Sequence, residues 1–277
     1  MAKRTSETQL KVIFLHIPKT AGQSVHAALV NAFGKEVVCP ARVNDQLRRM
    51  TITELNRYQV FSGHFDWSLL DCIKGPKYVF TILREPIDRI LSFYFYLRDE
   101  AEKLPTEQRT TPERQGLKAA FELSPREYFL GAPPHLRRFL DDHYDNFYTY
   151  YFAGRHYESR GEMVGLINRG ELSRQHVLQM AKDNLTLLDD VFTVDSMSAV
   201  FSAIRAISGK QLMADDKYRV NINTKVAAED RRMQLQALGA DTATMERLQE
   251  YCSLDNELWK LFAMKSTPVI FQADTSA

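Results

Sequence analysis

Apolar residues follow two patterns along the first two hundred positions of the chain. Short unbroken apolar runs predict buried strands, and apolar positions spaced three and four residues apart predict helices. The runs that predict strands are Lys11 to Ile17, Tyr58 to Ser62, Tyr78 to Leu83 and Val191 to Val194. The runs that predict helices are Ser24 to Phe33, Pro86 to about Lys103, Ser173 to Leu188 and Ser196 to Ile207. This alternation predicts an α/β fold with a mostly parallel sheet and helices on both of its faces.

Two further segments are helical by pattern. Prolines divide residues 99–145 into short pieces, and we expect this segment to be a helical insertion that covers one edge of the sheet. Residues 227–265 predict helices that pack on the sheet, with Asp241 as the N-cap of one of them. Residues 266–277 are expected to form a tail, and residues 1–277 a single domain.

Composition narrows the class of protein only slightly. The chain is 44% hydrophobic and 26% charged, which is ordinary for a soluble globular protein. A formal net charge of +1 gives no global basic field for nucleic acid or an anionic membrane surface. Cys39, Cys72 and Cys252 are far apart, with neither zinc spacing nor a disulfide framework, which favours a reducing compartment. No apolar stretch approaches the roughly 18 residues of a membrane span, so none is expected.

The first predicted strand runs directly into the sequence PKTAGQS, residues 18–24, and then into a helix. A helix N-terminus presents unpaired N–H groups and the positive end of its dipole, which suits an anion. Gly22 lets the backbone approach an oxyanion closely, Thr20 and Ser24 add hydroxyl groups, and Lys19 adds a mobile positive charge. An ordinary strand-to-helix turn is the alternative, but this combination within a few positions favours an anion-binding loop.

A second candidate anion site follows the strand Tyr78 to Leu83. Arg84 stands at the end of that strand, Pro86 suits the first turn of the next helix, and Ser92 lies on that helix. An arginine at a strand end and a hydroxyl on the following helix can hold a phosphate. Alternatively, Arg84 forms an ion pair at the edge of the core and Ser92 only packs. Two such sites suggest a ligand that carries phosphates at two separated points.

These segments resemble the sulfotransferases that use 3′-phosphoadenosine 5′-phosphosulfate (PAPS), and most of all the heparan and uronyl 2-O-sulfotransferases. HIPKTAGQS, residues 16–24, is similar to the loop that binds the 5′-phosphosulfate in that family, with Gln23 in place of the usual Thr. LREPIDRILSFYFYLR, residues 83–98, is similar to the family's 3′-phosphate motif, and FSGHF, residues 61–65, resembles the Gly-His that carries its candidate base. Two positions depart from the glycan enzymes: Ser62 replaces a second His, and Thr149-Tyr150 replaces a Thr-Arg pair.

The resemblance implies a P-loop-like fold and specific roles for the matching residues. It implies that PAPS is the donor and that adenosine 3′,5′-bisphosphate is the product. No cluster of His, Cys and Asp residues has metal-ligand spacing, so no metal is expected. The residues implied to bind the donor are Lys19, Thr20, Ala21, Gly22, Gln23, Ser24, Arg84 and Ser92. His64 is implied to be the base that deprotonates an acceptor hydroxyl, while Lys19 stabilises the leaving phosphate. The acceptor is expected to be a carbohydrate or a small molecule, with residues 99–145 as one wall of its pocket.

The Golgi members of that family are anchored in the membrane. Because this chain shows no anchor pattern, a cytoplasmic enzyme is expected. The sequence predicts neither the identity of the acceptor nor the oligomeric state.

Lys19, His64 and Arg84 each follow a predicted strand. Because the carboxyl ends of parallel strands share one edge of a sheet, we expect these three residues to lie at one crevice.

Three histidines lie near these motifs. Without the resemblance, His64 would be a structural residue; with it, His64 is the candidate base. His16 is expected to be a buried, hydrogen-bonded residue that strengthens the loop, and the role of His26 is open.

Two other classes of protein compete with a sulfotransferase. A P-loop kinase or NTPase would also place a loop between a strand and a helix, but this loop has one glycine and Lys19 precedes it. Asp66 and Asp195 are the acidic residues that could hold magnesium in that case. A non-catalytic nucleotide-binding protein is the other alternative, and the presence of both Lys19 and His64 argues against it.

Overall fold

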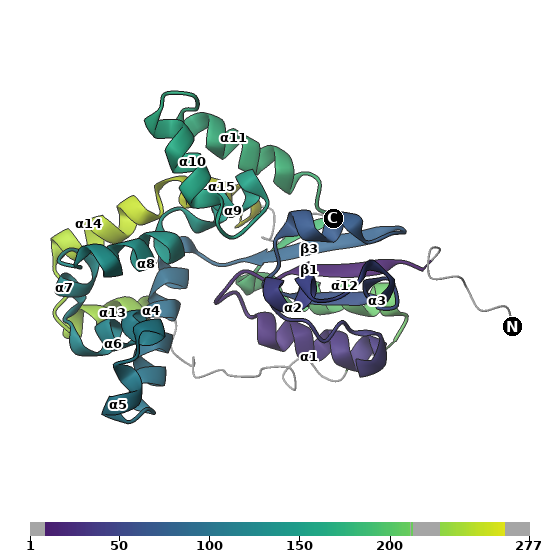
Figure 1. The fold of residues 1–277 in the computed structure, drawn as a ribbon, viewed down its shortest axis with the longest axis horizontal. Helices are drawn as coiled ribbons and strands as arrows, with labels where there is room; N and C mark the ends of the chain where they lie inside the picture. The colour runs from purple at the N-terminus through teal and green to yellow at the C-terminus, as the bar shows by residue number, and fades with distance from the viewer. Residues whose placement is uncertain (1–8, 211, 213–227, 264–277) are drawn as a thin grey trace, which may run out of the picture.

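The structure is a computed structural model that describes residues 9–210, 212 and 228–263. Its centre is a sheet of four parallel strands in the order β2-β1-β3-β4. Figure 1 labels the two inner strands, β1 and β3. The strands are β1 (Lys11–Leu15), β2 (Val60–Gly63), β3 (Lys77–Leu83) and β4 (Asp190–Thr193). All four correspond to predicted strands within a few residues, so the prediction of an α/β fold with a parallel sheet is confirmed.

Side chains alternate along the buried strands, so both faces of the sheet carry apolar residues. Helices cover both of these faces. Val12 and Phe14 of β1 face a core that contains α1 (Gly22–Phe33) and α12 (Met197–Ser208). Ile13 and Leu15 face the opposite core. That second core is covered by α9 (Phe147–Gly154), α11 (Arg174–Leu185) and α15 (Ser253–Ala263). The sheet is therefore buried on both faces, as its continuous apolar strands predict.

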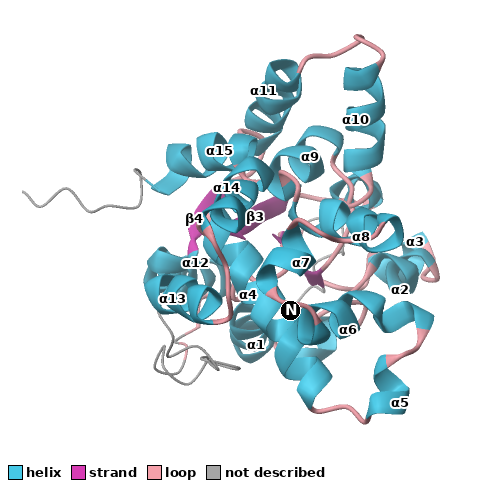
Figure 2. Cartoon of the chain, turned by 90° about the vertical axis from the view of Figure 1, so that its left-hand side faces the viewer, coloured by secondary structure: helices cyan, strands magenta, loops and turns pink. Residues whose placement is uncertain are grey.

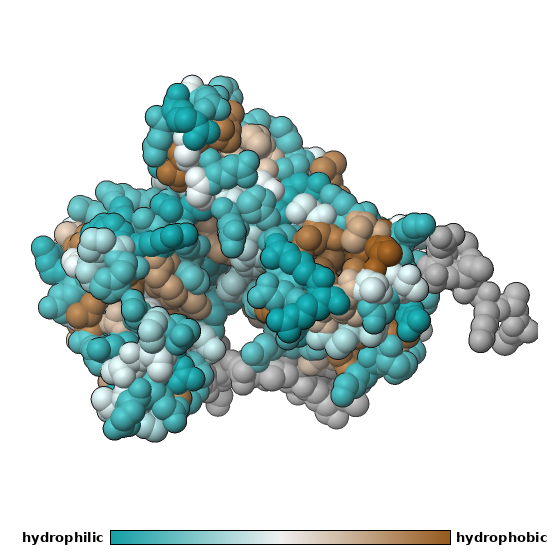
Figure 3. Space-filling view, viewed as in Figure 1, coloured by the Kyte–Doolittle hydropathy of each residue, from teal (hydrophilic) through white to brown (hydrophobic). Residues whose placement is uncertain are grey.

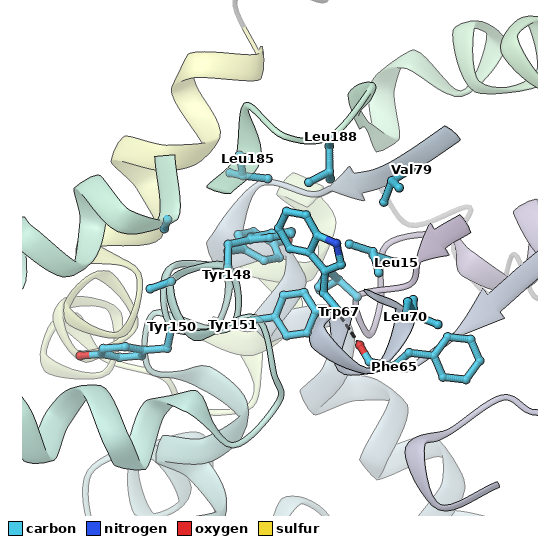
Figure 4. Close-up of a cluster of buried hydrophobic side chains, with 14 of the residues drawn as sticks. Leu15, Phe65, Trp67, Leu70, Val79, Tyr148, Tyr150, Tyr151, Leu185 and Leu188 are labelled. Atoms are coloured by element: carbon cyan, nitrogen blue, oxygen red, sulfur yellow. Dashed lines mark hydrogen bonds between the residues drawn. The ribbon is translucent and has the colours of Figure 1, made fainter. Parts of the chain in front are cut away.

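The second core is built largely of aromatic side chains. Figure 4 shows Leu15 of β1 close to Trp67 and Tyr151. The hydroxyl of Tyr151 donates a hydrogen bond of 2.7 Å to the carbonyl oxygen of Phe65, just beyond β2. This bond anchors α9 to the chain that follows β2, next to His64.

A separate group of helices lies beside the sheet and shares the long helix α4 (Pro86–Glu102) with it (Figures 1 and 2). This helix begins just after β3 and brings buried residues such as Tyr94 into a third core with Phe129, Tyr144 and Leu248. The helices of this group, besides α4, are α5 (Thr106–Arg109), α6 (Gln115–Glu122), α7 (Pro125–Phe129), α8 (Pro134–Tyr144), α13 (Ala228–Ala237) and α14 (Thr242–Tyr251). Residues 99–145 therefore contain the end of α4 and the helices α5 to α8.

The remaining elements connect these parts. They are η1 (Lys35–Val37), α2 (Asn44–Arg48), α3 (Ile52–Leu55), η2 (Trp67–Cys72), η3 (Pro112–Arg114), α10 (Ser159–Asn168) and η4 (Val194–Ser196). The predicted cap Asp241 is confirmed, since its side chain accepts a 2.9 Å hydrogen bond from the N–H of Thr244. The predicted tail, residues 266–277, lies outside the described residues. In the part of the chain that the structure describes, no helix is long and apolar enough to cross a membrane.

Candidate active site

The loop between β1 and α1 is held in an unusual backbone conformation. Lys19 and Ala21 both have left-handed backbone angles, with φ of 72° and 64°. Such angles are unfavourable for residues other than glycine and persist only where the surroundings enforce them, which is common at ligand-binding sites. The buried hydroxyl of Thr20 supplies part of that constraint by donating a 2.8 Å hydrogen bond to the carbonyl oxygen of Ile17. Thr20 therefore stabilises the loop from inside.

Gly22 is required by the packing of His16. A Cβ atom at position 22 would lie only 1.8 Å from Nε2 of the His16 imidazole, so any other residue there would overlap the ring. The prediction that His16 is buried is confirmed, at 7% exposure. The prediction that the residue is hydrogen-bonded holds for its backbone carbonyl oxygen, but Nδ1 of its ring has no hydrogen-bond partner. The ring is held instead by stacking, with its centroid 4.1 Å from that of His64.

A cavity of about 640 Å³ opens in front of this loop, between the sheet and the helices beside it. Figure 3 shows the surface hollowed between these two halves of the molecule. With the exception of Thr20, every residue that the resemblance implied to bind the donor or to be catalytic lines this cavity: His64, Lys19, Ala21, Gly22, Gln23, Ser24, Arg84 and Ser92. The predicted convergence of the strand ends on one crevice is therefore present in the fold.

Arg84 connects three parts of the cavity wall. Its Nη1 donates to Oγ of Ser92 at 2.9 Å and to the carbonyl oxygen of Lys19 at 3.1 Å. Its Nε donates to the carboxylate of Asp88. The guanidinium thus joins the end of β3, the loop and the first turns of α4, and Arg84 and Ser92 lie together as the second candidate anion site requires.

Arg231 of α13 completes this cationic cluster, and sequence reasoning did not find it. Its Nη1 donates to Asp88 at 2.6 Å, its side chain is buried, and it lines the cavity. Asp88 is therefore shared by two guanidinium groups, which leaves one positive charge uncompensated within this group of three. No local motif marks Arg231, because it lies 143 residues from its partner in the sequence.

Lys19 also has partners that the sequence did not reveal. Its Nζ lies 4.0 Å from the centroid of the Tyr96 ring, an aromatic side chain of α4 on the cavity wall. Burial, and next the charge of Arg84, lower the pKa of Lys19 from 10.5 to about 8. The ammonium is therefore mostly charged at neutral pH, and a bound anion would stabilise the charged form further.

Hydrogen bonds fix which nitrogen of His64 can act as a base. Nδ1 lies 2.8 Å from the carbonyl oxygen of His16 and 3.2 Å from the hydroxyl of Tyr157. The Tyr157 hydroxyl donates its own proton to the same carbonyl oxygen at 2.7 Å. Because a carbonyl oxygen can only accept, Nδ1 carries the ring proton and the lone pair is on Nε2. Burial is the main cause that lowers the pKa of His64 below 6.5, so the ring is neutral near pH 7.

The two acidic candidates for a magnesium site do not line the cavity. The Asp66 carboxylate accepts hydrogen bonds from Arg48 at 3.1 Å and from the backbone N–H of Tyr157 at 2.9 Å, so it braces the structure behind His64. Asp195 is exposed, in η4. Within residues 9–210, 212 and 228–263, no group of three or more His, Cys, Asp or Glu side chains is placed to hold a metal ion.

The fold and the site together define an α/β protein that presents a candidate strand–loop–helix anion site and a second cationic cluster to one cavity. Comparison with protein families identifies the chain more closely. The model of the sulfotransferase family matches residues 4–262, and the chain therefore belongs to that family. A comparison with curated proteins finds no match. Membership of this family supports an enzyme that transfers a sulfo group.

Proposed function

We propose that this protein transfers the sulfo group of PAPS to a hydroxyl group of a carbohydrate or small-molecule acceptor. One observation carries the proposal: two separate cationic sites and an imidazole with its lone pair on Nε2 all line one cavity. A donor with phosphates at two points and a sulfo group at one end requires this combination.

The donor's 5′-phosphosulfate is assigned to the loop. Lys19 and residues 21–24 line the cavity here, and they include the start of α1, where unpaired N–H groups suit an anion. Thr20 acts there chiefly by holding the loop in shape.

The 3′-phosphate is assigned to Arg84 and Ser92, and we add Arg231 to them. Because two guanidinium groups share only one carboxylate, that of Asp88, the cluster keeps a net positive charge for the phosphate. This charge distinguishes PAPS from nucleotides without a 3′-phosphate.

The transfer is an in-line displacement at sulfur. The acceptor oxygen attacks the sulfur atom while Nε2 of His64 takes the hydroxyl proton. The bond between sulfur and the bridging phosphate oxygen breaks, and its electron pair stays on that oxygen. The ammonium of Lys19 stabilises the negative charge that develops there. The products are the sulfated acceptor, adenosine 3′,5′-bisphosphate and a proton, and no step requires a metal.

The acceptor side of the cavity lies along α4. Beyond Ser92 this helix presents Tyr96, Asp99, Glu100 and Lys103 to the cavity, with aromatic, acidic and basic groups mixed. A long sulfated polyanion would favour a continuous cationic groove. The resemblance to 2-O-sulfotransferases therefore extends, in this proposal, to the reaction and the donor, while the acceptor is a small molecule or a short saccharide.

Mass spectrometry tests the proposal. The protein is incubated with PAPS and fractionated acceptor extracts, and we expect an acceptor to gain one sulfo group. His135→Ala, in an exposed histidine away from the cavity, serves as the matched control for His64→Ala. Magnesium-dependent ATP hydrolysis without sulfo transfer would instead assign the protein to the kinases or NTPases. Binding of the bisphosphate without turnover of any acceptor would assign it to the non-catalytic nucleotide-binding proteins.

A further inference from the structure

Two aromatic rings hold the imidazole of His64 in place on the cavity wall. The ring of His16 stacks on it, with the centroids 4.1 Å apart and an angle of 26° between the planes. The ring of Tyr157 meets it edge-on, with the centroids 6.2 Å apart and an angle of 89° between the planes. His16 and His64 line the cavity, whereas Tyr157 does not and lies in the connection between α9 and α10. An effect of Tyr157 on the acceptor must therefore pass through His64.

Tyr157 places its hydroxyl group at the protonated nitrogen of His64. The hydroxyl donates its proton to the carbonyl oxygen of His16 at 2.7 Å, which leaves the lone pairs of its own oxygen atom to accept. Nδ1 of His64 lies 3.2 Å from that oxygen atom and 2.8 Å from the same carbonyl oxygen. Burial raises the pKa of Tyr157 well above 10, so the hydroxyl keeps its proton at neutral pH. The Nδ1–H group therefore has two neutral acceptors, one on the backbone and one on a side chain.

Contacts outside His64 fix the position of Tyr157. Its backbone N–H donates a 2.9 Å hydrogen bond to the buried carboxylate of Asp66. Its ring packs edge-on against the rings of Tyr151 and Phe147, with the centroids 4.9 and 5.7 Å away. A side chain that is held at its backbone and at its ring presents its hydroxyl in one direction. The acceptor at Nδ1 is therefore in place before His64 is protonated.

The other surroundings of His64 oppose its protonation. Burial, and further the charge of Arg42, lower the pKa of His64, while the hydrogen bond to the His16 carbonyl raises it. In the part of the chain that the structure describes, no carboxylate is hydrogen-bonded to the ring of His64. The base nevertheless becomes an imidazolium when it takes the acceptor proton, and an N–H group of a cation forms stronger hydrogen bonds than one of a neutral ring. The two acceptors at Nδ1 therefore stabilise the transition state more than the resting protein.

We propose that Tyr157 is a positioning residue for the base, whose hydroxyl holds Nδ1–H of His64 and stabilises the imidazolium that forms during sulfo transfer. The proposal rests on the proposed function, in which His64 is the base. The acceptor proton moves to Nε2 of His64, while the proton on Nδ1 and the hydroxyl proton of Tyr157 stay on their atoms. A tyrosine hydroxyl and a backbone carbonyl thus have the role that a carboxylate has in a Ser–His–Asp triad.

Tyr157→Phe tests this role, because it removes the hydroxyl and keeps the ring. Loss of a hydrogen bond to a charged group should lower kcat roughly ten- to a hundredfold, while KM for PAPS and the affinity for the bisphosphate stay as in the wild type. His64 should also become harder to protonate, so the acidic limb of kcat/KM should move to lower pH. The other titratable and charged groups around His64 and Tyr157 are unchanged in this variant, and they are His16, Lys19, Arg42 and Asp66.

Tyr151→Phe is the matched control. The hydroxyl of Tyr151 is also buried and also donates a 2.7 Å hydrogen bond to a backbone carbonyl oxygen, but its partner is Phe65 and not His64. We expect both variants to lose similar stability in denaturant unfolding, and Tyr151→Phe to keep the kcat and the acidic limb of the wild type. An equal loss of kcat in both variants would overturn the proposal, because packing alone would explain it. Wild-type kcat with a wild-type acidic limb in Tyr157→Phe would also overturn it.

Nuclear magnetic resonance of the His64 side chain in the full-length protein tests the contact without an acceptor. In the wild type, the nitrogen shifts should place the ring proton on Nδ1. The pKa of His64 should be lower in Tyr157→Phe than in the wild type and in Tyr151→Phe. An equal pKa in Tyr157→Phe overturns the proposal, and so does a proton on Nε2 in the wild type, which is decisive even where the variant does not fold. If no acceptor gains a sulfo group, the proposed function fails, while this titration still decides whether Tyr157 acts on His64.

Discussion

The two walls of the cavity are built in different ways. On the sheet wall, the loop and His64 are fixed by short-range contacts to backbone atoms at the ends of β1 and β2. Nδ1 of His64 and the hydroxyl of Thr20 each lie 2.8 Å from a carbonyl oxygen of the chain just after β1. On the helical wall, Arg84 and Arg231 are held by the carboxylate of Asp88, and the contact between Arg231 and Asp88 spans 143 residues of sequence.

This difference suggests that the two walls have different roles in the reaction. Backbone contacts at strand ends fix atoms closely, which suits groups that must be oriented during bond breaking. Side-chain ion pairs between helices collect charge from distant segments, which suits recognition of a phosphate. We therefore expect changes on the sheet wall to act mainly on turnover and changes on the helical wall to act mainly on donor affinity.

The largest effect is expected for His64. Replacement by Ala should lower kcat by roughly 10²–10⁴, the usual contribution of a general base, while the protein still folds and binds the bisphosphate. His64→Asn should be similarly slow, because an amide cannot take the proton. Retention of near-normal transfer in His64→Ala, with His135→Ala as the control, would place the base elsewhere.

The pH profile gives a second test of His64. The base must be neutral, so the rate should fall as the pH drops through its pKa. Burial lowers that pKa below 6.5, and the acidic limb of kcat/KM should therefore lie below about 6.5. The limb should disappear from the residual activity of His64→Ala.

The next largest effect is expected for Lys19, on the sheet wall beside Tyr96 of the helical wall. Lys19→Ala should lower kcat by roughly a hundredfold, because charge grows on the leaving oxygen only as the bond breaks. Affinity for the bisphosphate should fall much less, and Lys35→Ala, in an exposed lysine, serves as the control. A variant with normal kcat and only a raised KM would assign Lys19 to binding and would remove it from the chemistry.

The protonation of Lys19 should also limit the rate at high pH. Its pKa is about 8 in the free protein, so kcat/KM should fall as the pH rises through about 8 and the ammonium is lost. The negative charge of bound PAPS should raise this pKa, and the alkaline limb of kcat should therefore lie higher than that of kcat/KM.

On the helical wall we expect a smaller effect, which concerns donor affinity and not turnover. Arg84→Ala should weaken binding of adenosine 3′,5′-bisphosphate by about 1.5–3 kcal/mol, the range for hydrogen bonds to charged groups, and should leave 5′-AMP binding nearly unchanged. Arg231→Ala should act in the same direction, because Asp88 would then neutralise Arg84. Calorimetry with both nucleotides measures this, and Arg49→Ala, in an exposed arginine that does not line the cavity, is the control. Equal affinity of the wild type for both nucleotides would contradict the assignment of the 3′-phosphate.

The last and smallest effect concerns the stability of the protein, and it tests how the sheet wall is built through Gly22. Gly22→Ala should destabilise the protein by roughly 1–3 kcal/mol, since its Cβ would overlap the His16 ring. Adding His16→Ala should restore much of this loss, as measured by denaturant unfolding. If the double variant is no more stable than Gly22→Ala alone, the ring of His16 is not the reason for the glycine.

Sequence patterns predicted the sheet wall more completely than the helical wall. The strands, the loop and the position of His64 follow from local apolar runs and from the rule that parallel strands end at one edge of the sheet. Arg84 and Ser92 also lie on one strand–helix unit, so their proximity was predictable. The pairing of Arg231 with Asp88 and the contact of Tyr96 with Lys19 were not, because each joins segments that are distant in sequence.

The sequence by itself therefore determined the class of fold, the candidate anion loop and the residues that carry the candidate chemistry, because each is encoded within a few neighbouring positions. Only the tertiary structure decided which nitrogen of His64 keeps its lone pair, why position 22 must be glycine, and how Arg231 is placed. These features depend on contacts between side chains and backbone from separate elements, and the packing of those elements creates them.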